Sequence, residues 1–156
     1  MTVTQTPDDL TATTTIAASP AQVWAMVTDV ARMSSWSPQV VRTVVVGRPV
    51  RLGTRFVNIN HQGWKHWPTT AKVVRFTPHS DFAFRIAENH SVWSYRLEPT
   101  DDGGTLVTHR RELPDGISLL SRGLTKVALG GQDCFAAELR EGMERTLERL
   151  KAEAER

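Results

Sequence analysis

The chain has 156 residues, 40% of them hydrophobic and 23% charged, which is typical of one globular domain and unlike disordered or membrane-embedded chains. Its 19 basic and 17 acidic residues leave a net charge of +2, too small for the basic footprint of a nucleic-acid-binding protein. The single cysteine excludes an intrachain disulfide and a cysteine-based zinc cage.

The N-terminal residues are polar and rich in threonine, and we expect residues 1–9 to be a flexible lead-in to a single domain over residues 10–156. They lack the basic stretch followed by an apolar run that marks a secretory signal. No segment is apolar for long enough to span a bilayer. The sequence therefore predicts a cytoplasmic protein without integral membrane association.

The first structured segments are a strand and a short helix. Leu10–Ile16 alternates apolar residues with threonine, the period-two pattern of a half-buried strand. Ser19 then precedes Pro20 and is followed three residues later by Gln22, which together make a capping box with proline in the first turn. These signals predict a strand that leads directly into a helix.

A second short helix is expected to begin after Asp29 and to run to about Met33. Trp36 and Ser37 come before Pro38, and proline disfavours helix in the residue that precedes it. The next stretch, as far as Glu112, carries runs of β-branched and aromatic residues separated by turn signals. It predicts six strands, joined by short links into an antiparallel meander: Val40–Val46, Thr54–His61, Trp67–Thr77, Phe82–Ala87, Val92–Glu98 and Thr105–Glu112.

The period changes to a helical one near the C-terminus. Apolar residues recur at helical spacing over 117–128, until Gly130 and Gly131 interrupt them. From Gln132 to about Ala152, charged residues cover one side of the chain and an apolar stripe the other. The stripe consists of Phe135, Leu139, Met143, Leu147 and Leu150. This pattern predicts a long amphipathic helix that packs on the sheet.

The order of these elements resembles the helix-grip fold, in which a curved antiparallel sheet wraps around a long C-terminal helix. Several segments also resemble the bacterial polyketide cyclase/dehydrase branch of the SRPBCC superfamily, which includes START lipid-transfer domains and plant pathogenesis-related allergens. They are Ile16–Trp24, Trp36–Pro38, Gly53–Phe56 with Asn60, Trp93–Pro99 before Gly103–Thr105, and Leu147–Lys151. The resemblance covers residues 10–152 and implies an α+β fold of seven strands, with two short helices between the first two. It also implies a deep cavity between sheet and helix that binds, carries or cyclises hydrophobic compounds.

The residues themselves suggest which side chains surround such a cavity. Phe82, Phe84 and Ile86 share one face of their strand, as Trp93, Tyr95 and Leu97 do on theirs, so we expect both aromatic sets on the concave side. Gly142 in the long helix has two explanations, namely a close contact between helix and sheet, or space for a ligand.

The strand Thr105–Glu112 has two alternating faces, and the sequence does not determine which one points inward. If Val107, His109 and Arg111 face the cavity, the last two can polarise a ligand carbonyl or carboxylate. The alternative, which residue statistics favour, is a solvated and charged strand end.

The hairpin stretch Asn58–Trp67, which contains Asn60, His61, Trp64 and His66, is rich in aromatic and amide side chains and suits the mouth of a pocket. No carboxylate lies in this stretch to complete a metal site around the two histidines. The sequence shows no triad order, phosphate-binding glycine loop or paired carboxylates, so no cofactor or metal is expected.

We therefore expect the protein to bind a small hydrophobic molecule that is polyketide-, lipid- or sterol-like. The alternative is an enzyme of the polyketide cyclase/dehydratase type that acts on such a ligand by acid–base chemistry. The apolar and aromatic candidates for ligand contact are Trp64, Phe84, Trp93, Tyr95, Leu124 and Met143. The polar candidates are Asn60, Arg85, His109 and Arg111. The segment Ile117–Leu129 is a candidate lid, nucleic acid is not an expected partner, and the protein is expected to be a monomer or a homodimer.

Overall fold

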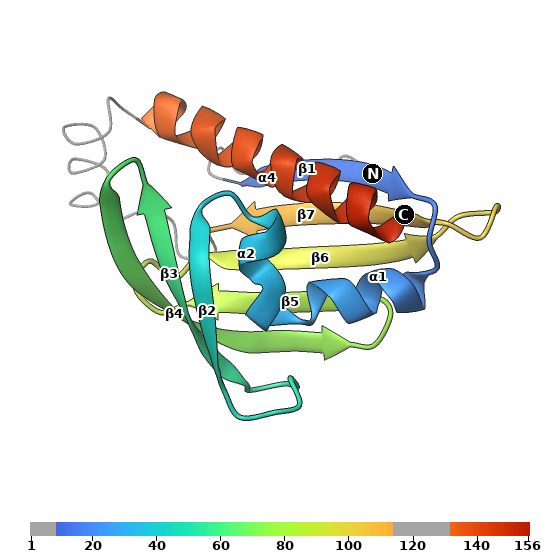
Figure 1. Ribbon diagram of the computed structural model, residues 1–156, viewed down its shortest axis with the longest axis horizontal. Coiled ribbons are helices and arrows are strands. Elements are labelled where there is room, and N and C mark those ends of the chain that lie inside the picture. Colours follow the sequence, from blue (N-terminus) through green and yellow to red (C-terminus); the bar gives the residue numbers. More distant parts are fainter. Residues whose placement is uncertain (1–8, 114–131) are drawn as a thin grey trace.

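Seven antiparallel strands form one sheet in the order β1-β7-β6-β5-β4-β3-β2. The computed structural model describes residues 9–113 and 132–156, and the side chains of the last helix from residue 136 onward. The candidate lid Ile117–Leu129, with Leu124, lies outside these described residues. The remaining architecture is an α+β helix-grip fold (Figure 1).

The strands follow the alternation in the sequence closely. Their bounds are β1 Leu10–Ile16, β2 Val40–Val46, β3 Arg55–Gln62, β4 Lys65–Thr77, β5 Asp81–Ile86, β6 Val92–Pro99 and β7 Thr105–Glu112. Three of them match the predicted bounds, and the others differ by one or two residues at an end. Strand β4 starts earlier than predicted because Lys65 and Gln62 pair across a tight turn.

Helix α1, Pro20–Val27, begins as predicted. The Ser19 hydroxyl accepts a hydrogen bond from the Gln22 backbone amide at 3.2 Å, and the Gln22 side chain accepts one from the Ser19 amide at 2.9 Å. This reciprocal pair satisfies two amides that the helix itself leaves without partners. The apolar face of α1 buries Val23, Trp24 and Val27.

The predicted second helix differs in its start and its end. Asp29 precedes a single 3₁₀ turn, η1 Val30–Arg32, but its side chain makes no capping hydrogen bond. The chain then continues into α2, Met33–Trp36, three residues beyond the predicted end. Ser37, in the extended conformation before Pro38, ends this helix as expected. The misplaced boundary follows from burial of both Met33 and Trp36, which fixes an extra turn against the sheet.

Helix α4, Gln132–Ala154, crosses one face of the sheet on the side of β1 (Figure 1). Its predicted stripe faces inward, since Leu139, Met143, Leu147 and Leu150 are at most 5% exposed. Lys151 fixes the far end of the helix by donating a hydrogen bond to the Thr15 carbonyl at 2.6 Å.

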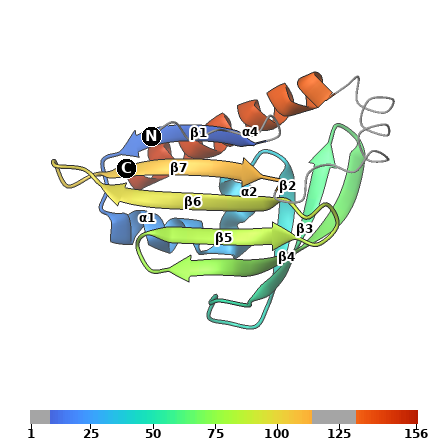
Figure 2. The same ribbon diagram turned by 180° about the vertical axis from the view of Figure 1, so that it is seen from behind.

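The hydrophobic core lies between the concave face of the sheet and the helices. Phe82 and Phe84, together with Trp24 and Phe56, form edge-to-face and tilted aromatic contacts within it. Figure 2 shows the opposite face of the sheet, over which no helix of the described chain lies. The described residues contain no helix long and apolar enough to cross a membrane.

Candidate functional site

A pocket of about 180 Å³ lies between the concave face of the sheet, α4, and the loop that follows α2. Apolar and aromatic side chains supply most of its wall, and a few polar groups converge on it, as in small-molecule sites generally. Its lining includes Met33, Asn58, Asn60, Trp67, Phe84, Trp93, Tyr95, His109, Arg111 and Met143.

Strands β6 and β7 build one continuous wall of stacked rings. Tyr95 lies directly opposite His109 in the strand register, and their rings are parallel with centroids 4.2 Å apart. Trp93 lies opposite Arg111, and the guanidinium carbon of Arg111 lies 5.8 Å from the centre of the indole. This wall is preorganised, because each ring is held by its cross-strand neighbour.

His109 is uncharged in this wall. Its Nδ1 lies 2.9 Å from the Ser94 carbonyl oxygen, which can only accept, so Nδ1 carries the proton and Nε2 is an acceptor. Burial lowers the pKa of His109 from 6.5 to about 4, against the opposing effect of the Ser94 carbonyl. The Nε2 atom makes no hydrogen bond to any residue in the described part of the chain.

The Tyr95 hydroxyl is a second polar group in this wall. Tyr95 is 4% exposed, and burial raises the pKa of its phenol because the phenolate is poorly solvated there. Within residues 9–113 and 132–156 we find no hydrogen bond from this hydroxyl to the protein. The pocket therefore presents one neutral donor-acceptor and one neutral acceptor side by side.

The facing wall, on β3 and β4, holds amides whose donors are already in use. The Asn60 side-chain nitrogen donates to the Thr69 hydroxyl at 2.9 Å and to the Trp67 carbonyl at 3.2 Å. The Asn58 amide oxygen accepts from the Thr43 hydroxyl at 2.7 Å. The Asn58 amide nitrogen in turn lies 3.6 Å from Met33 Sδ, so hydrogen bonds fix both amides in the wall.

Gly142 of α4 lies at the pocket, and its surroundings distinguish the two explanations for it. A methyl group built at Gly142 meets Pro38 Cγ at 3.8 Å and Gln39 Nε2 at 3.9 Å, which are ordinary contact distances. A close contact between helix and sheet therefore does not require glycine here. The absent side chain instead leaves room at the pocket beside the loop 37–39.

Seven of the ten sequence-predicted site residues line this pocket: Asn60, Phe84, Trp93, Tyr95, His109, Arg111 and Met143. The expectation that β7 ends as a solvated, charged strand is wrong, since His109 and Arg111 are 3% and 7% exposed. Their pairing with Tyr95 and Trp93 turns them toward the cavity, where the Arg111 guanidinium lies over the Trp93 ring.

Two predicted residues do not reach the pocket. Trp64 is 85% exposed at the tip of the β3–β4 hairpin, where the Lys65 ammonium lies 5.9 Å from the centre of its ring. Arg85 lies on the outer face, because it alternates with Phe84 and Ile86, whose side chains point inward. Leu124 lies outside the described residues.

Sequence reasoning missed Met33 and Thr69, which also line the pocket, whereas Asn58 and Trp67 belong to the hairpin that was expected at the pocket mouth and line it as well. A signal for Thr69 was present, since it shares the alternation of Ala71 and Val73, which are buried. Met33 gave no signal, because its position depends on the extra helical turn of α2.

The two hairpin histidines make structural contacts. His61 Nε2 lies 3.0 Å from the Pro38 carbonyl, and His66 Nδ1 lies 3.1 Å from the Trp64 carbonyl. Their rings stack with centroids 5.9 Å apart. Among the described residues, no three His, Cys, Asp or Glu side chains are grouped closely enough to hold a metal ion.

Comparison with known proteins places this architecture in a family. The family described as polyketide cyclase/dehydrase and lipid transport matches residues 7–155, almost the whole chain. The chain belongs to this family. A search among curated proteins finds no match.

Solved structures with the same fold include two polyketide aromatase/cyclases. The ZhuI aromatase/cyclase from Streptomyces sp. R1128 has a TM-score of 0.71 and 16% identity over 95% of this chain and 93% of its own. The di-domain aromatase/cyclase StfQ of the steffimycin pathway has a TM-score of 0.72 and 16% identity, over 95% of this chain and 50% of its own. The Aha1 dimer from Colwellia psychrerythraea has a TM-score of 0.65 and 17% identity, over 94% of this chain and 96% of its own. At 16–17% identity, the likeness to these three solved structures shows the fold alone.

Proposed function

We propose that the protein binds a small, planar and largely apolar molecule that carries an un-ionised hydroxyl group. The observation that carries this proposal is the wall of β6 and β7, where stacked rings surround an acceptor nitrogen, His109 Nε2, that has no partner in the described chain. A ligand hydroxyl can donate a hydrogen bond to this atom, and the ring of Tyr95 stacks on the ring that carries it.

The size of the pocket limits what it holds. Its volume of about 180 Å³ is below the roughly 300–1,000 Å³ of drug-sized ligand sites. One or two fused rings fit such a volume, whereas a sterol or a two-chain lipid has to extend through the mouth. At the position of the proposed hydroxyl, the neutral side chains of His109 and Tyr95 favour an uncharged group, because a carboxylate there would lose its hydration without a charged partner. Arg111, which also lines the pocket, lies over the Trp93 ring.

We expect naphthol to bind more tightly than methoxynaphthalene, which has the same ring system but no donor. In His109→Phe this preference should disappear, because the acceptor nitrogen is gone, while methoxynaphthalene binding changes little. A lost hydrogen bond between neutral groups corresponds to about tenfold in affinity. Fluorescence titration measures both affinities. Equal preference for naphthol in the parent protein and in His109→Phe contradicts the assignment of the hydroxyl to His109.

A second candidate function is a cyclase or dehydratase that uses acid–base chemistry, and one observation favours it. Tyr95 and His109 place a proton donor and a proton acceptor side by side in one pocket, as catalysis on a carbonyl compound requires. Binding remains our proposal because a histidine with a pKa of about 4 is a weak base near neutral pH.

A further inference from the structure

The charges of the chain are unevenly distributed over the fold. Between Asp29 and Asp81 the sequence contains no Asp or Glu. It contains these Lys and Arg residues: Arg32, Arg42, Arg48, Arg51, Arg55, Lys65, Lys72 and Arg75. Arg32 pairs with Glu153 and Arg75 with Asp81. The other six are exposed and make no ion pair to any described residue.

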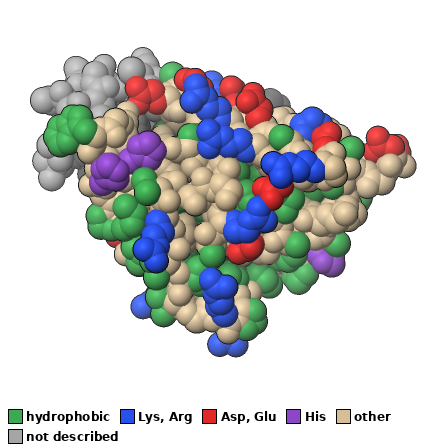
Figure 3. Space-filling model, in the orientation of Figure 1, with side chains coloured by type: hydrophobic (Ala, Val, Ile, Leu, Met, Phe, Trp, Pro, Cys, Tyr) green, Lys and Arg blue, Asp and Glu red, His purple; other side chains and the backbone are tan. Residues whose placement is uncertain are grey.

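Exposed apolar side chains occur in the same stretch of the sequence. Within the described residues, all large hydrophobic side chains that are exposed lie between residues 41 and 74. Val46 and Leu52, at the loop between β2 and β3, are 66% and 62% exposed. Figure 3 shows Lys and Arg side chains at the lower end of the molecule, where this loop lies, with hydrophobic side chains beside them.

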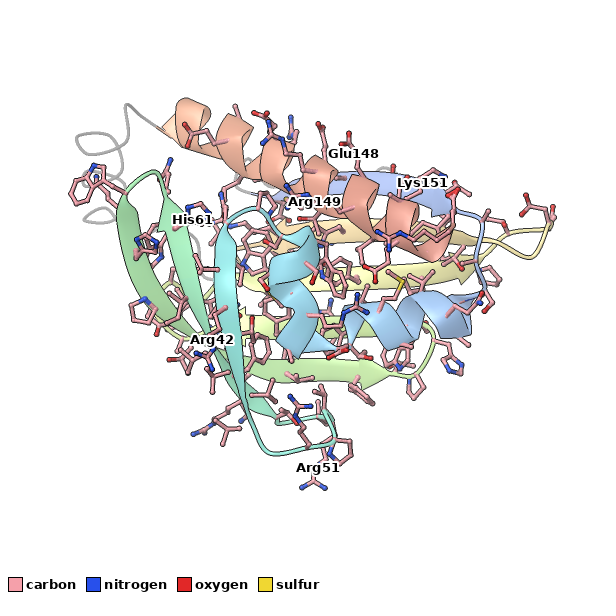
Figure 4. All side chains as sticks on the ribbon, in the orientation of Figure 1. Arg42, Arg51, His61, Glu148, Arg149 and Lys151 are labelled. Carbon is pink, nitrogen blue, oxygen red and sulfur yellow. The ribbon has the colours of Figure 1, made fainter. Side chains whose placement is uncertain are left out.

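The loop between β2 and β3, residues 46–55, is also hollowed. A surface hollow of about 350 Å³ is lined by Arg48, Arg51 and Arg55 together with Val46 and Leu52. Figure 4 shows Arg51 extending from this loop away from the body of the molecule, and Arg42 on the adjoining strand. Arg55 lies directly opposite Lys72 in the strand register, and like charges in that position repel. A bound anion relieves this repulsion.

We propose that the loop 46–55 docks the protein on the surface of an anionic phospholipid bilayer. Guanidinium groups form bidentate hydrogen bonds with phosphate, and basic residues are attracted to a negatively charged membrane surface. Val46 and Leu52 are exposed at the same hollow as the arginines and can enter the boundary between headgroups and acyl chains. A nucleic acid fits less well, because single-stranded bases stack on aromatic rings, and the residues that line the hollow include no aromatic side chain.

Sedimentation with vesicles tests this proposal on the full chain. We expect the protein to sediment with vesicles of phosphatidylcholine and phosphatidylserine at low ionic strength, and to remain in solution with phosphatidylcholine alone. High salt should release it, because screening weakens attraction between exposed charges. The double variant Arg48→Gln, Arg51→Gln should bind the anionic vesicles at least about tenfold more weakly than the parent.

The matched control is Arg140→Gln, Arg149→Gln, which removes the same charge from the exposed face of α4. It should bind anionic vesicles as the parent does, and circular dichroism should confirm that both variants are folded. An equal loss in the control overturns the proposal, because net charge alone then explains the binding. The proposal is also overturned if the parent protein does not bind anionic vesicles but binds soluble polyglutamate through Arg48 and Arg51. That result would indicate an acidic protein partner instead.

Discussion

Acidification should destabilise the parent protein by about 2–3 kcal/mol more than it destabilises His109→Phe, between neutral pH and about pH 4.5. The folded state keeps His109 neutral until the pH approaches its pKa of about 4, whereas the unfolded chain takes up the proton near 6.5. Between these values the unfolded state binds more protons, so the free energy of unfolding falls as the pH falls. Above the unfolded pKa this contribution is fully present.

Urea unfolding at a series of pH values measures the effect. Loss of the hydrogen bond to the Ser94 carbonyl lowers the stability of His109→Phe by a constant amount, so only the difference in slope reports the titration. The carboxylates titrate alike in both proteins and cancel in the comparison. Parallel pH profiles for the two proteins would mean that His109 is solvated and titrates normally in the folded state.

Phe82→Ala should lower the free energy of unfolding by about 3–5 kcal/mol, the usual cost of removing a buried aromatic ring. Phe82 is fully buried, and its ring contacts those of Trp24, Phe76 and Phe84 at centroid distances of 6.0 to 6.3 Å. It does not line the pocket. Naphthol affinity, measured under conditions where the variant is folded, should therefore stay close to that of the parent.

Trp93→Ala should show the opposite combination. Trp93 is half-buried on the pocket wall, where part of its ring faces open volume rather than packed atoms, so its removal leaves a smaller loss of packing. We expect a loss of about 1–2 kcal/mol in stability together with weaker binding of naphthol. Chemical denaturation and fluorescence titration of both variants provide the comparison. A stability loss as large as that of Phe82→Ala, with unchanged affinity, would make Trp93 a core residue.

Local patterns in the sequence were sufficient to predict most of the fold. The alternation in Leu10–Ile16 and the capping box at Ser19 depend on neighbours in the chain, and both predictions are confirmed. The inward-facing stripe of α4 could be predicted for the same reason, because i, i+3 and i+4 spacing is a property of the helix itself. The predicted end of the second short helix was wrong, because the observed end of α2 depends on burial of Trp36, a contact with residues distant in the chain.

The site was less predictable because it depends on strand register. The sequence of β7 alone does not show which face is inward, and the polar character of His109 and Arg111 favoured the wrong one. Pairing with Tyr95 and Trp93 decides it, since cross-strand neighbours share a face. Arg85, by contrast, could have been excluded as a pocket residue from the sequence alone, because it alternates with Phe84 and Ile86 along its strand.

The most direct test of ligand binding in this pocket is naphthol titration of the parent protein, Gly142→Ala and Gly142→Leu. Alanine and leucine both favour helix over glycine, by up to about 1 kcal/mol, and the surroundings of Gly142 leave ordinary contact distance for an added carbon. We predict that Gly142→Ala is at least as stable as the parent and binds slightly more weakly. Gly142→Leu should remain folded and lose binding by about tenfold or more, because its side chain occupies the pocket beside Pro38 and Gln39. Folded Gly142→Leu that binds naphthol as tightly as the parent would contradict the claim that this pocket is the binding site.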